Sequence, residues 1–210
     1  MNRIRQSGHI EGQFTSLVFV PINGKVTDIL SKQRDNILHI LNDFHQTHGC
    51  DSSSSNWEFI GNDQLHLSLS RTTFLKVYML DPFLERLRES IHTPSDSCVY
   101  LCDTLRLYVN DEGNTAFVGV PIDKSISPVI LDTIKVIDSV LSEFDQKTFY
   151  SNPDPHVSVA YTTDPHILRS FSSHSGTELG SMNLSDAEIE RFGLDIGTIH
   201  VQLGNQTHVV

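Results

Sequence analysis

One short pattern occurs twice in the chain, in residues 65–72 and again 90 positions later in residues 155–162. Each copy alternates between polar and apolar side chains, which is typical of a strand that buries one face. Each copy also holds a His followed two residues later by a Ser, namely His66 with Ser68 and His156 with Ser158. Side chains two apart on a strand share a face, so each His points to the same side as its Ser. The sequence therefore predicts two matching strands, and their core-facing side is formed by Leu67, Leu69, Val157 and Val159.

The rest of the chain mixes short strand-like runs with helical periodicity. Strands are predicted over residues 14–21, 65–72, 105–109, 115–121 and 156–162, with further short strands between 189 and 210. Helices are predicted over residues 27–48, 81–91 and 125–144, where apolar side chains recur at helical spacing. The polar segments 51–56 and 170–185 are interpreted as loops, and residues 110–114 as a hairpin turn. This order favours an α+β fold with antiparallel strands and helices packed against their outer faces.

Chain length and composition limit the domain organisation and the location. With 210 residues, of which 38% are hydrophobic, the chain can bury one sizeable core, so we expect a single domain over residues 1–210. No apolar run approaches the roughly 20 residues of a membrane span, and the first residues are polar, so we expect a soluble intracellular protein without a membrane partner. Cys50, Cys98 and Cys102 indicate neither a disulfide framework nor a zinc site, because their number is odd and no metal spacing is present.

The repeated His-x-Ser pattern suits attack on a phosphodiester. One imidazole can remove a proton from the nucleophile while the other protonates the leaving oxygen, and the serine hydroxyls can donate to the non-bridging phosphate oxygens. A single His-x-Ser occurs often by chance and then marks only a half-exposed polar face, but two matched copies are much less easily accidental. His45 and His48 stand three apart, yet no further Cys or His completes a metal site, and a helix C-terminus that favours cations explains them. We therefore expect catalysis without a metal and without a cofactor.

The two motifs resemble the signature of the two-histidine (2H) phosphoesterase superfamily. Over residues 65–70 and 148–160 the chain is more closely similar to the U6 snRNA phosphodiesterase (Usb-type) family, and the likeness extends to residues 14–21, 107–119 and 203–205. The resemblance implies two pseudo-symmetric lobes of antiparallel sheet, with helices on their outer faces and an active-site cleft between the lobes. It also implies a 3′-to-5′ RNA exonuclease of the nucleus that trims the oligouridine 3′ end of U6 snRNA and leaves a 2′,3′-cyclic phosphate or a 3′ phosphate.

The same resemblance implies the contacts with the substrate. Tyr150 would stack on the terminal base, and Asp154 and Pro155 would help to line the pocket of that nucleotide. The alternative for Tyr150 is an aromatic side chain of the core. Asn110 and Asp111, in the predicted hairpin turn, match a region that contacts the base.

The chemistry expected from this family is an intramolecular transesterification. His156 would take the proton from the 2′-hydroxyl of the penultimate nucleotide and His66 would protonate the departing 5′-oxygen, or the two roles would be reversed. Two alternatives remain: a 2H phosphodiesterase that acts on small or tRNA-derived 2′,3′-cyclic phosphates, and a non-catalytic module that binds RNA ends. A net charge of −11 argues against a protein that binds a duplex through many basic contacts. This argument is weaker for a protein that grips only one or two nucleotides at an RNA 3′ end, where a small local pocket matters more than the overall field. We expect the protein to be a monomer.

Overall fold

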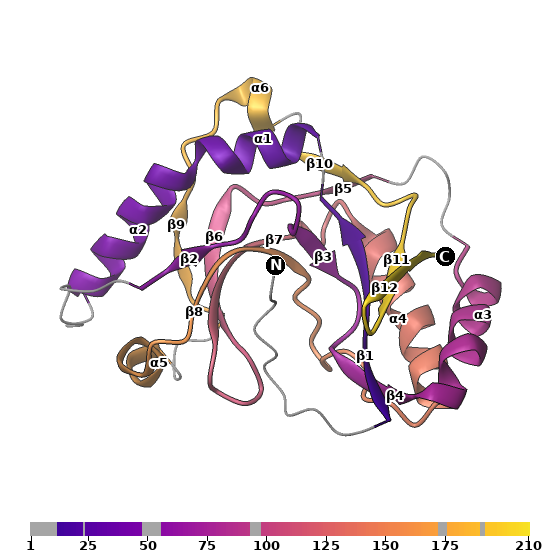
Figure 1. Ribbon diagram of the computed structural model, residues 1–210. Coiled ribbons are helices and arrows are strands. Elements are labelled where there is room, and N and C mark those ends of the chain that lie inside the picture. Colours follow the sequence, from indigo (N-terminus) through magenta and orange to yellow (C-terminus); the bar gives the residue numbers. More distant parts are fainter. Residues whose placement is uncertain (1–11, 23, 48–55, 93–97, 172–175, 190–191) are drawn as a thin grey trace.

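A ten-stranded antiparallel sheet runs through the structure, a computed structural model that describes residues 12–22, 24–47, 56–92, 98–171, 176–189 and 192–210 (Figure 1). Neighbouring strands follow the order β12-β11-β1-β3-β8-β7-β6-β9, while β4 also pairs with β1, and β2 with β8. A separate two-stranded sheet joins β10 to β5. The strands are β1 (Gln13–Pro21), β2 (Glu58–Phe59), β3 (His66–Ser68), β4 (Thr73–Lys76), β5 (Cys98–Tyr100), β6 (Thr104–Val109), β7 (Ala116–Pro121), β8 (His156–Thr162), β9 (Glu178–Ser181), β10 (Gly193–Asp195), β11 (His200–Leu203) and β12 (Gln206–Val209). The α+β prediction with antiparallel strands is confirmed.

The large sheet consists of two halves that meet at one seam. The first half contains β12, β11, β1, β3 and β4, and the second contains β8, β7, β6, β9 and β2. The halves are joined through β3 and β8, where Leu67 pairs with Val157. Both of these side chains are fully buried. The two motif strands of the predicted lobes are therefore direct neighbours.

The two halves repeat one local construction around their motif strands. In the first half Pro21, at the end of β1, pairs with His66, and in the second half Pro121, at the end of β7, pairs with His156. In each half the N–H of the Ile after that proline donates to the carbonyl of the residue before the His, at 2.9 Å in the first half and 3.0 Å in the second. Both prolines belong to a Val-Pro-Ile sequence, and the two copies lie 100 residues apart. The pseudo-symmetry is therefore present in the backbone hydrogen bonds.

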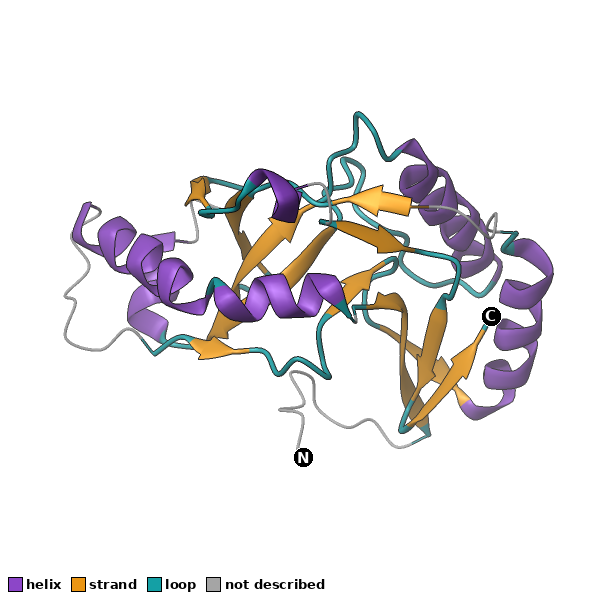
Figure 2. Ribbon diagram, turned by 90° about the horizontal axis from the view of Figure 1, so that it is seen from above, coloured by secondary structure: helices purple, strands orange, loops and turns teal. Residues whose placement is uncertain are grey.

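Helices flank the sheet on opposite sides. Figures 1 and 2 show α1 and α2 on one side of the molecule and α3 with α4 on the other. The helices are α1 (Lys25–Lys32), α2 (Arg34–Thr47), α3 (Leu80–Ser90), α4 (Pro128–Glu143), α5 (Pro165–Phe171) and α6 (Asp186–Ile189), and a short 3-10 helix, η2 (Val77–Met79), precedes α3. Phe83 of α3 meets Phe144 after α4 edge to face, with ring centroids 5.3 Å apart. Within the described ranges, no helix has the length and apolar character that crossing a membrane requires.

The helix predicted over residues 27–48 is divided into α1 and α2 at Gln33. The Gln33 N–H donates to the carbonyls of Ile29 and Leu30, at 3.2 Å each, and its buried side-chain amide donates to the Asn183 carbonyl at 2.9 Å. This tie to a distant segment accompanies the break, which periodicity does not reveal because the apolar spacing continues across it. The last predicted residue, His48, lies outside the described residues.

The strand predicted over residues 65–72 is shorter than expected. The chain leaves β3 after Ser68, and the Ser70 hydroxyl accepts a hydrogen bond from the Val18 N–H at 2.9 Å. The Ser70 N–H in turn donates to the Val18 carbonyl at 3.3 Å. This side-chain contact takes the place of a regular ladder bond, and the chain pairs with β1 again only as β4.

The segment 170–185, predicted to be a loop, contains the strand β9. It pairs with β6 across an irregular register. Gly180 within β9 has a φ of 149°, a value that side-chain-bearing residues rarely adopt. A short polar strand with this irregularity lacks the alternation by which strands are recognised, so the loop prediction was wrong. Residues 172–175 lie outside the described part of this segment.

Candidate active site

The four motif side chains share one face of the sheet at the seam. Extending the register of the buried seam pair by one residue each way places His66 beside Ser158 and Ser68 beside His156. All four side chains are partly exposed, whereas the intervening residues face the core. Directly opposed side chains have Cβ atoms about 5 Å apart and diagonal ones about 7 Å apart. The two imidazoles therefore stand at diagonal corners of this set of four side chains.

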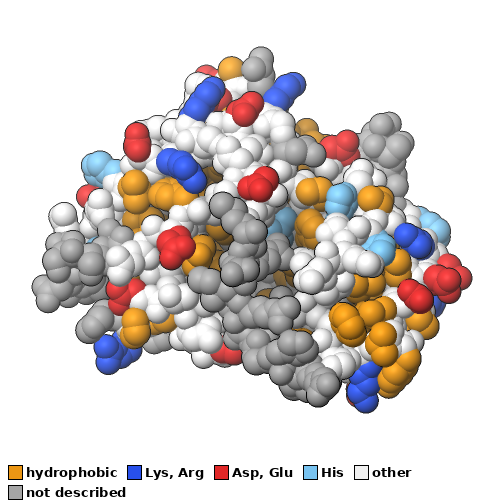
Figure 3. Space-filling model, in the orientation of Figure 1, with side chains coloured by type: hydrophobic (Ala, Val, Ile, Leu, Met, Phe, Trp, Pro, Cys, Tyr) orange, Lys and Arg blue, Asp and Glu red, His pale blue; other side chains and the backbone are white. Residues whose placement is uncertain are grey.

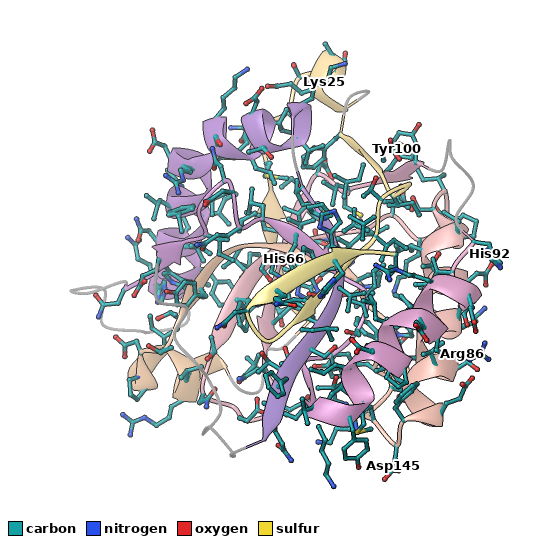
Figure 4. The ribbon with its side chains drawn as sticks, turned by 45° about the vertical axis from the view of Figure 1, so that its right-hand side comes forward. Lys25, His66, Arg86, His92, Tyr100 and Asp145 are labelled. Atoms are coloured by element: carbon teal, nitrogen blue, oxygen red, sulfur yellow. The ribbon has the colours of Figure 1, made fainter. Side chains whose placement is uncertain are left out.

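This position lies near the centre of the molecule. Figure 4 shows His66 near the middle, whereas Lys25, Arg86 and Asp145 lie toward the periphery. Figure 3 shows histidine side chains at the surface near the middle of one face, next to hydrophobic side chains.

Both imidazoles are held in the same way by the backbone. The His66 Nδ1 lies 2.8 Å from the Gln64 carbonyl, and the His156 Nδ1 lies 2.9 Å from the Asp154 carbonyl. A carbonyl can only accept, so each Nδ1 carries a hydrogen and, in the neutral ring, Nε2 is the nitrogen that bears the lone pair. The hydroxyls of Ser68 and Ser158 form no hydrogen bond with other described residues, so both remain able to donate to a substrate oxygen.

The surroundings of the two imidazoles differ. Phe19 meets the His66 ring nearly edge-on, with centroids 5.5 Å apart and an interplanar angle of 71°. Tyr108 instead stacks flat on the His156 ring, with centroids 3.5 Å apart and an angle of 9°. Burial lowers the pKa of the His156 imidazole below its ordinary value; the hydrogen bond and the charge of Asp154 oppose this shift, and the charge of His66 adds to it. His156 is therefore neutral near pH 7, as a general base must be.

Asp154 lies behind His156 at the centre of a charged network. Its carboxylate accepts a hydrogen bond from the Tyr108 hydroxyl at 3.0 Å and forms ion pairs with Arg106 at 3.3 Å and Lys124 at 3.2 Å. Burial alone would raise the pKa of Asp154, but the hydrogen bonds from Tyr108 and Lys124 and the charges of Lys124 and Arg106 together lower it. The Asp154 carboxylate is therefore bound by other side chains of the protein. Its role in lining the nucleotide pocket stays a prediction.

Tyr150 is exposed and belongs to a cluster that bridges the two halves. Its side chain is 46% exposed, which excludes the alternative of a core aromatic. The Arg71 guanidinium lies 4.6 Å from the centroid of its ring, and the Phe149 ring meets it edge-on at 5.3 Å. Arg71 also forms an ion pair with Asp111 of the hairpin loop. The stacking role of Tyr150 stays a prediction, which its exposure supports.

Asn110 and Pro155 are the remaining residues that were predicted to contact the substrate. The Asn110 side chain closes its own turn, because its Oδ1 accepts from the N–H groups of Asn114 and Thr115 at 3.0 and 3.1 Å. Pro155 is buried, and its carbonyl accepts from the Ile122 N–H at 3.0 Å. Asn110 and Pro155 thus have structural contacts, and a contact with a base stays a prediction for both.

The interpretation of His45 as a cation favoured by the helix C-terminus was wrong. Its side chain is buried, and its Nε2 accepts a hydrogen bond from the Trp57 indole N–H at 3.0 Å. Burial lowers its pKa, against a smaller opposite effect of Asp164, so the ring is neutral. Among the described residues no group of three or more His, Cys, Asp or Glu side chains could hold a metal ion.

Sequence reasoning missed Tyr108, Gly119, Arg106 and Arg71, all of which surround the motifs. Tyr108 reaches His156 across the strand β7, so its contact depends on strand order and not on spacing along the chain. The repeated Val-Pro-Ile sequence is a signal that could have located the strand beside each motif. Comparison of the two aligned halves would then have shown Gly119 where the first half has Phe19.

The whole chain matches one family model, and curated proteins resemble it at low identity. The family model is HVSL, described as an uncharacterised conserved protein, and it covers residues 1–210. The U6 snRNA phosphodiesterase 1 of Drosophila melanogaster is 24% identical over 204 residues, which cover 97% of this chain and 72% of that protein. The same-named protein of Dictyostelium discoideum is 21% identical, with 88% of this chain and 60% of that protein covered, and the human protein is 25% identical, with 76% and 54% covered. The chain thus spans roughly half to three quarters of the length of these relatives.

Solved structures share the fold. Kluyveromyces marxianus Usb1, solved both alone and with uridine monophosphate, aligns with a TM-score of 0.60 at 18% identity. The alignment covers 94% of this chain and 96% of that protein. At this identity the likeness establishes the two-lobed arrangement and leaves the chemistry to the residues of the site.

Proposed function

The chain belongs to the HVSL family, and from this membership we propose that it is a 3′-to-5′ RNA exonuclease that trims the oligouridine 3′ end of U6 snRNA. The names of its curated relatives, U6 snRNA phosphodiesterase 1, support this substrate. The observation that carries the proposal is the meeting of two His-x-Ser units at one seam, where each His lies beside the Ser of the other unit. Such a set supplies a base, an acid and two phosphate-binding hydroxyls.

The proposed reaction is an intramolecular transesterification. The neutral His156 Nε2 removes the proton of the penultimate 2′-hydroxyl, and that oxygen attacks the adjacent phosphorus. The bond from phosphorus to the 5′-oxygen of the last nucleoside breaks, and His66 gives that oxygen a proton. The hydroxyls of Ser68 and Ser158 hold the non-bridging oxygens as negative charge grows on them. The products are a free nucleoside and an RNA shortened by one unit, with a 2′,3′-cyclic phosphate that water can open to a 3′ phosphate.

The terminal nucleotide is proposed to lie beside the exposed ring of Tyr150. Its base stacks on that ring, and Asp154, Pro155, Asn110 and Asp111 surround the nucleotide. The enzyme acts as a monomer in the nucleus. It needs no metal, because the two imidazoles already provide proton transfer. Trimming should accordingly continue in excess EDTA, and a loss that a divalent ion restores would contradict this.

The nucleophile can be tested with a single altered sugar. An oligouridine with a 2′-deoxy sugar at the penultimate position should bind as well as the all-ribose oligomer but resist loss of its last nucleoside. The substitution removes one oxygen and leaves the phosphate and the terminal base in place, so a lost rate reflects chemistry. Equal trimming of both oligomers would exclude transesterification.

The same assay separates the other candidate functions. A cyclic phosphodiesterase would open uridine 2′,3′-cyclic phosphate and leave the oligouridine intact. A binding module would turn over neither substrate. Chain length and end group, both resolved by mass spectrometry, distinguish these outcomes.

A further inference from the structure

Tyr108 reaches the catalytic His156 from two strands away. Its strand, β6, is separated from β8 by β7, and Tyr108 itself pairs with Phe117. Its ring nevertheless lies flat on the imidazole, with centroids 3.5 Å apart. The ring therefore passes over β7 and covers one face of His156.

Gly119 leaves the space through which this contact is made. A Cβ at Gly119 would lie 2.7 Å from the His156 Cδ2 and 2.9 Å from the Tyr108 Cε2, distances that real Cβ atoms essentially never show. Gly119 stands opposite Ser158, next to a register shift between Val118 and Gly119. Glycine is thus required here because of space, and the two rings fill the place of its missing side chain.

The Tyr108 hydroxyl fixes the other side of the same unit. It donates to the Asp154 carboxylate at 3.0 Å, and the backbone carbonyl of Asp154 lies 2.9 Å from the His156 Nδ1. Burial, followed by the charge of Asp154, raises the pKa of Tyr108, so its hydroxyl keeps its proton and remains a donor. Tyr108 therefore packs against the face of the His156 ring. It also binds Asp154, whose backbone carbonyl fixes the tautomer of that ring.

Among the described residues, the first half of the sheet places different side chains at the equivalent positions. Phe19 pairs with Ser68 as Gly119 pairs with Ser158, so Phe19 takes the place of the glycine. Gln202 pairs with Leu17 as Tyr108 pairs with Phe117, so the first half has an amide where the second has a phenol. The two halves therefore share the same strand pairing but differ in the side chains that contact their motif histidines.

We propose that Tyr108 is a positioning residue, which stacks on His156 in the space left by Gly119 and makes that histidine, and not His66, the general base. The proposal rests on the proposed function, because it assigns roles within the same reaction. The stacking of the Tyr108 ring on His156 does not depend on which phosphodiester the site accepts.

The test compares two Tyr108 variants by kinetics and by NMR titration of the histidine ring protons. Tyr108→Leu removes the aromatic cover, so the His156 titration should move up toward that of an ordinary histidine, and the acidic limb of the kcat profile should move with it. We expect kcat to fall about tenfold or more and KM to change less than about twofold. Tyr108→Phe keeps the ring, so it should retain most of kcat and most of the lowered titration. Phe19→Leu, the matched change in the first half, should leave the His156 titration unchanged.

An unchanged His156 titration and kcat profile in Tyr108→Leu would overturn the proposal. If that variant does not fold, Gly119→Ala serves in its place, because the added methyl must push the two rings apart and shift the same titration. The NMR titration needs neither RNA nor turnover. A shifted titration in a protein without exonuclease activity would therefore reject the proposed function and support the cover of His156 by Tyr108.

Discussion

At the scale of single residues, the site combines one shared hydrogen-bond pattern with two different environments. The backbone carbonyls of Gln64 and Asp154 contact Nδ1 of the two imidazoles alike, so both rings have the same tautomer when neutral. Tyr108 and Phe19 then make the environments unlike, since one ring stacks on its histidine and the other meets its histidine edge-on. In the proposed mechanism this difference distinguishes the base from the acid, while the His-x-Ser motif is the same in both halves.

Replacing His66 or His156, the proposed acid and base, should abolish most turnover. His66→Ala and His156→Ala should each lower kcat by on the order of a thousandfold, and the double variant should be little worse, because the two groups act as a unit. His39→Ala, on the exposed face of α2, is the matched control and should keep full activity. Steady-state kinetics on an oligouridine measures the effect, and a near-normal rate in either single variant would exclude the paired mechanism.

Tyr150 should contribute to binding more than to chemistry. Removing its ring in Tyr150→Ala should raise KM by the equivalent of about 1 to 3 kcal/mol, the usual contribution of one base stacked on an aromatic ring. Tyr150→Phe should behave like the wild type, because the stacking surface is kept. Tyr78→Ala, at another exposed tyrosine, is the control. A KM that stays the same in Tyr150→Ala would show that the terminal base lies elsewhere.

At the scale of elements, the short strand β3 decides how the two histidines meet. It has three residues, and its central Leu67 provides the pairing with β8. Leu67→Ala should lower the free energy of unfolding by about 2 to 5 kcal/mol and also reduce kcat, because the cavity lies directly beneath the motifs. Leu87→Ala, at an equally buried position of α3, should lower stability by a similar amount and leave kcat unchanged.

Chemical denaturation and kinetics well below the melting temperature separate these two effects. Full kcat in folded Leu67→Ala would mean that the seam pair does not set the spacing of the motifs. A loss of kcat in Leu87→Ala would mean that any loss of core packing reaches the site. Either result contradicts the role assigned to the seam.

The sequence predicted the elements whose patterns are local. The strands β1, β6 and β7 and the helices α3 and α4 agree with the predicted ranges, because alternation and helical periodicity depend on near neighbours. The break at Gln33 and the strand β9 depend on contacts with Asn183 and with β6, which lie far away in the chain. The His-x-Ser units were predictable because they belong to local alternating patterns. The contact of Tyr108 with His156 was missed because it joins segments that are distant in the chain.

At the scale of the whole molecule, the buried His45 and the half-buried His156 link stability to pH. Burial lowers the pKa of both His45 and His156, whereas in an unfolded chain histidine titrates near 6.5. Between the folded and unfolded pKa values the unfolded state binds more protons, so stability rises with pH. We expect the contribution of these two histidines to the free energy of unfolding to be fully present above about pH 7. It should decrease as the pH falls from about 7 toward 5.

Urea denaturation at a series of pH values measures this dependence. His45→Gln should reduce the slope, because the glutamine amide does not titrate in this range. Asp154 adds a separate effect: its pKa is lowered, so its contribution is present above the unfolded value of about 4 and is lost as the pH falls through the lowered value. A midpoint that does not change between pH 5 and 8 would contradict the lowered pKa of the two imidazoles.

The strand order has a consequence for the protein during its synthesis. β1 is made first, yet the strand on its outer side, β11, comes almost last in the described chain, whereas β6, β7 and β8 follow one another and can pair early. Pairings between such distant segments form slowly. A chain that emerges from the ribosome therefore keeps one edge of β1 open until β11 and β12 have left the exit tunnel.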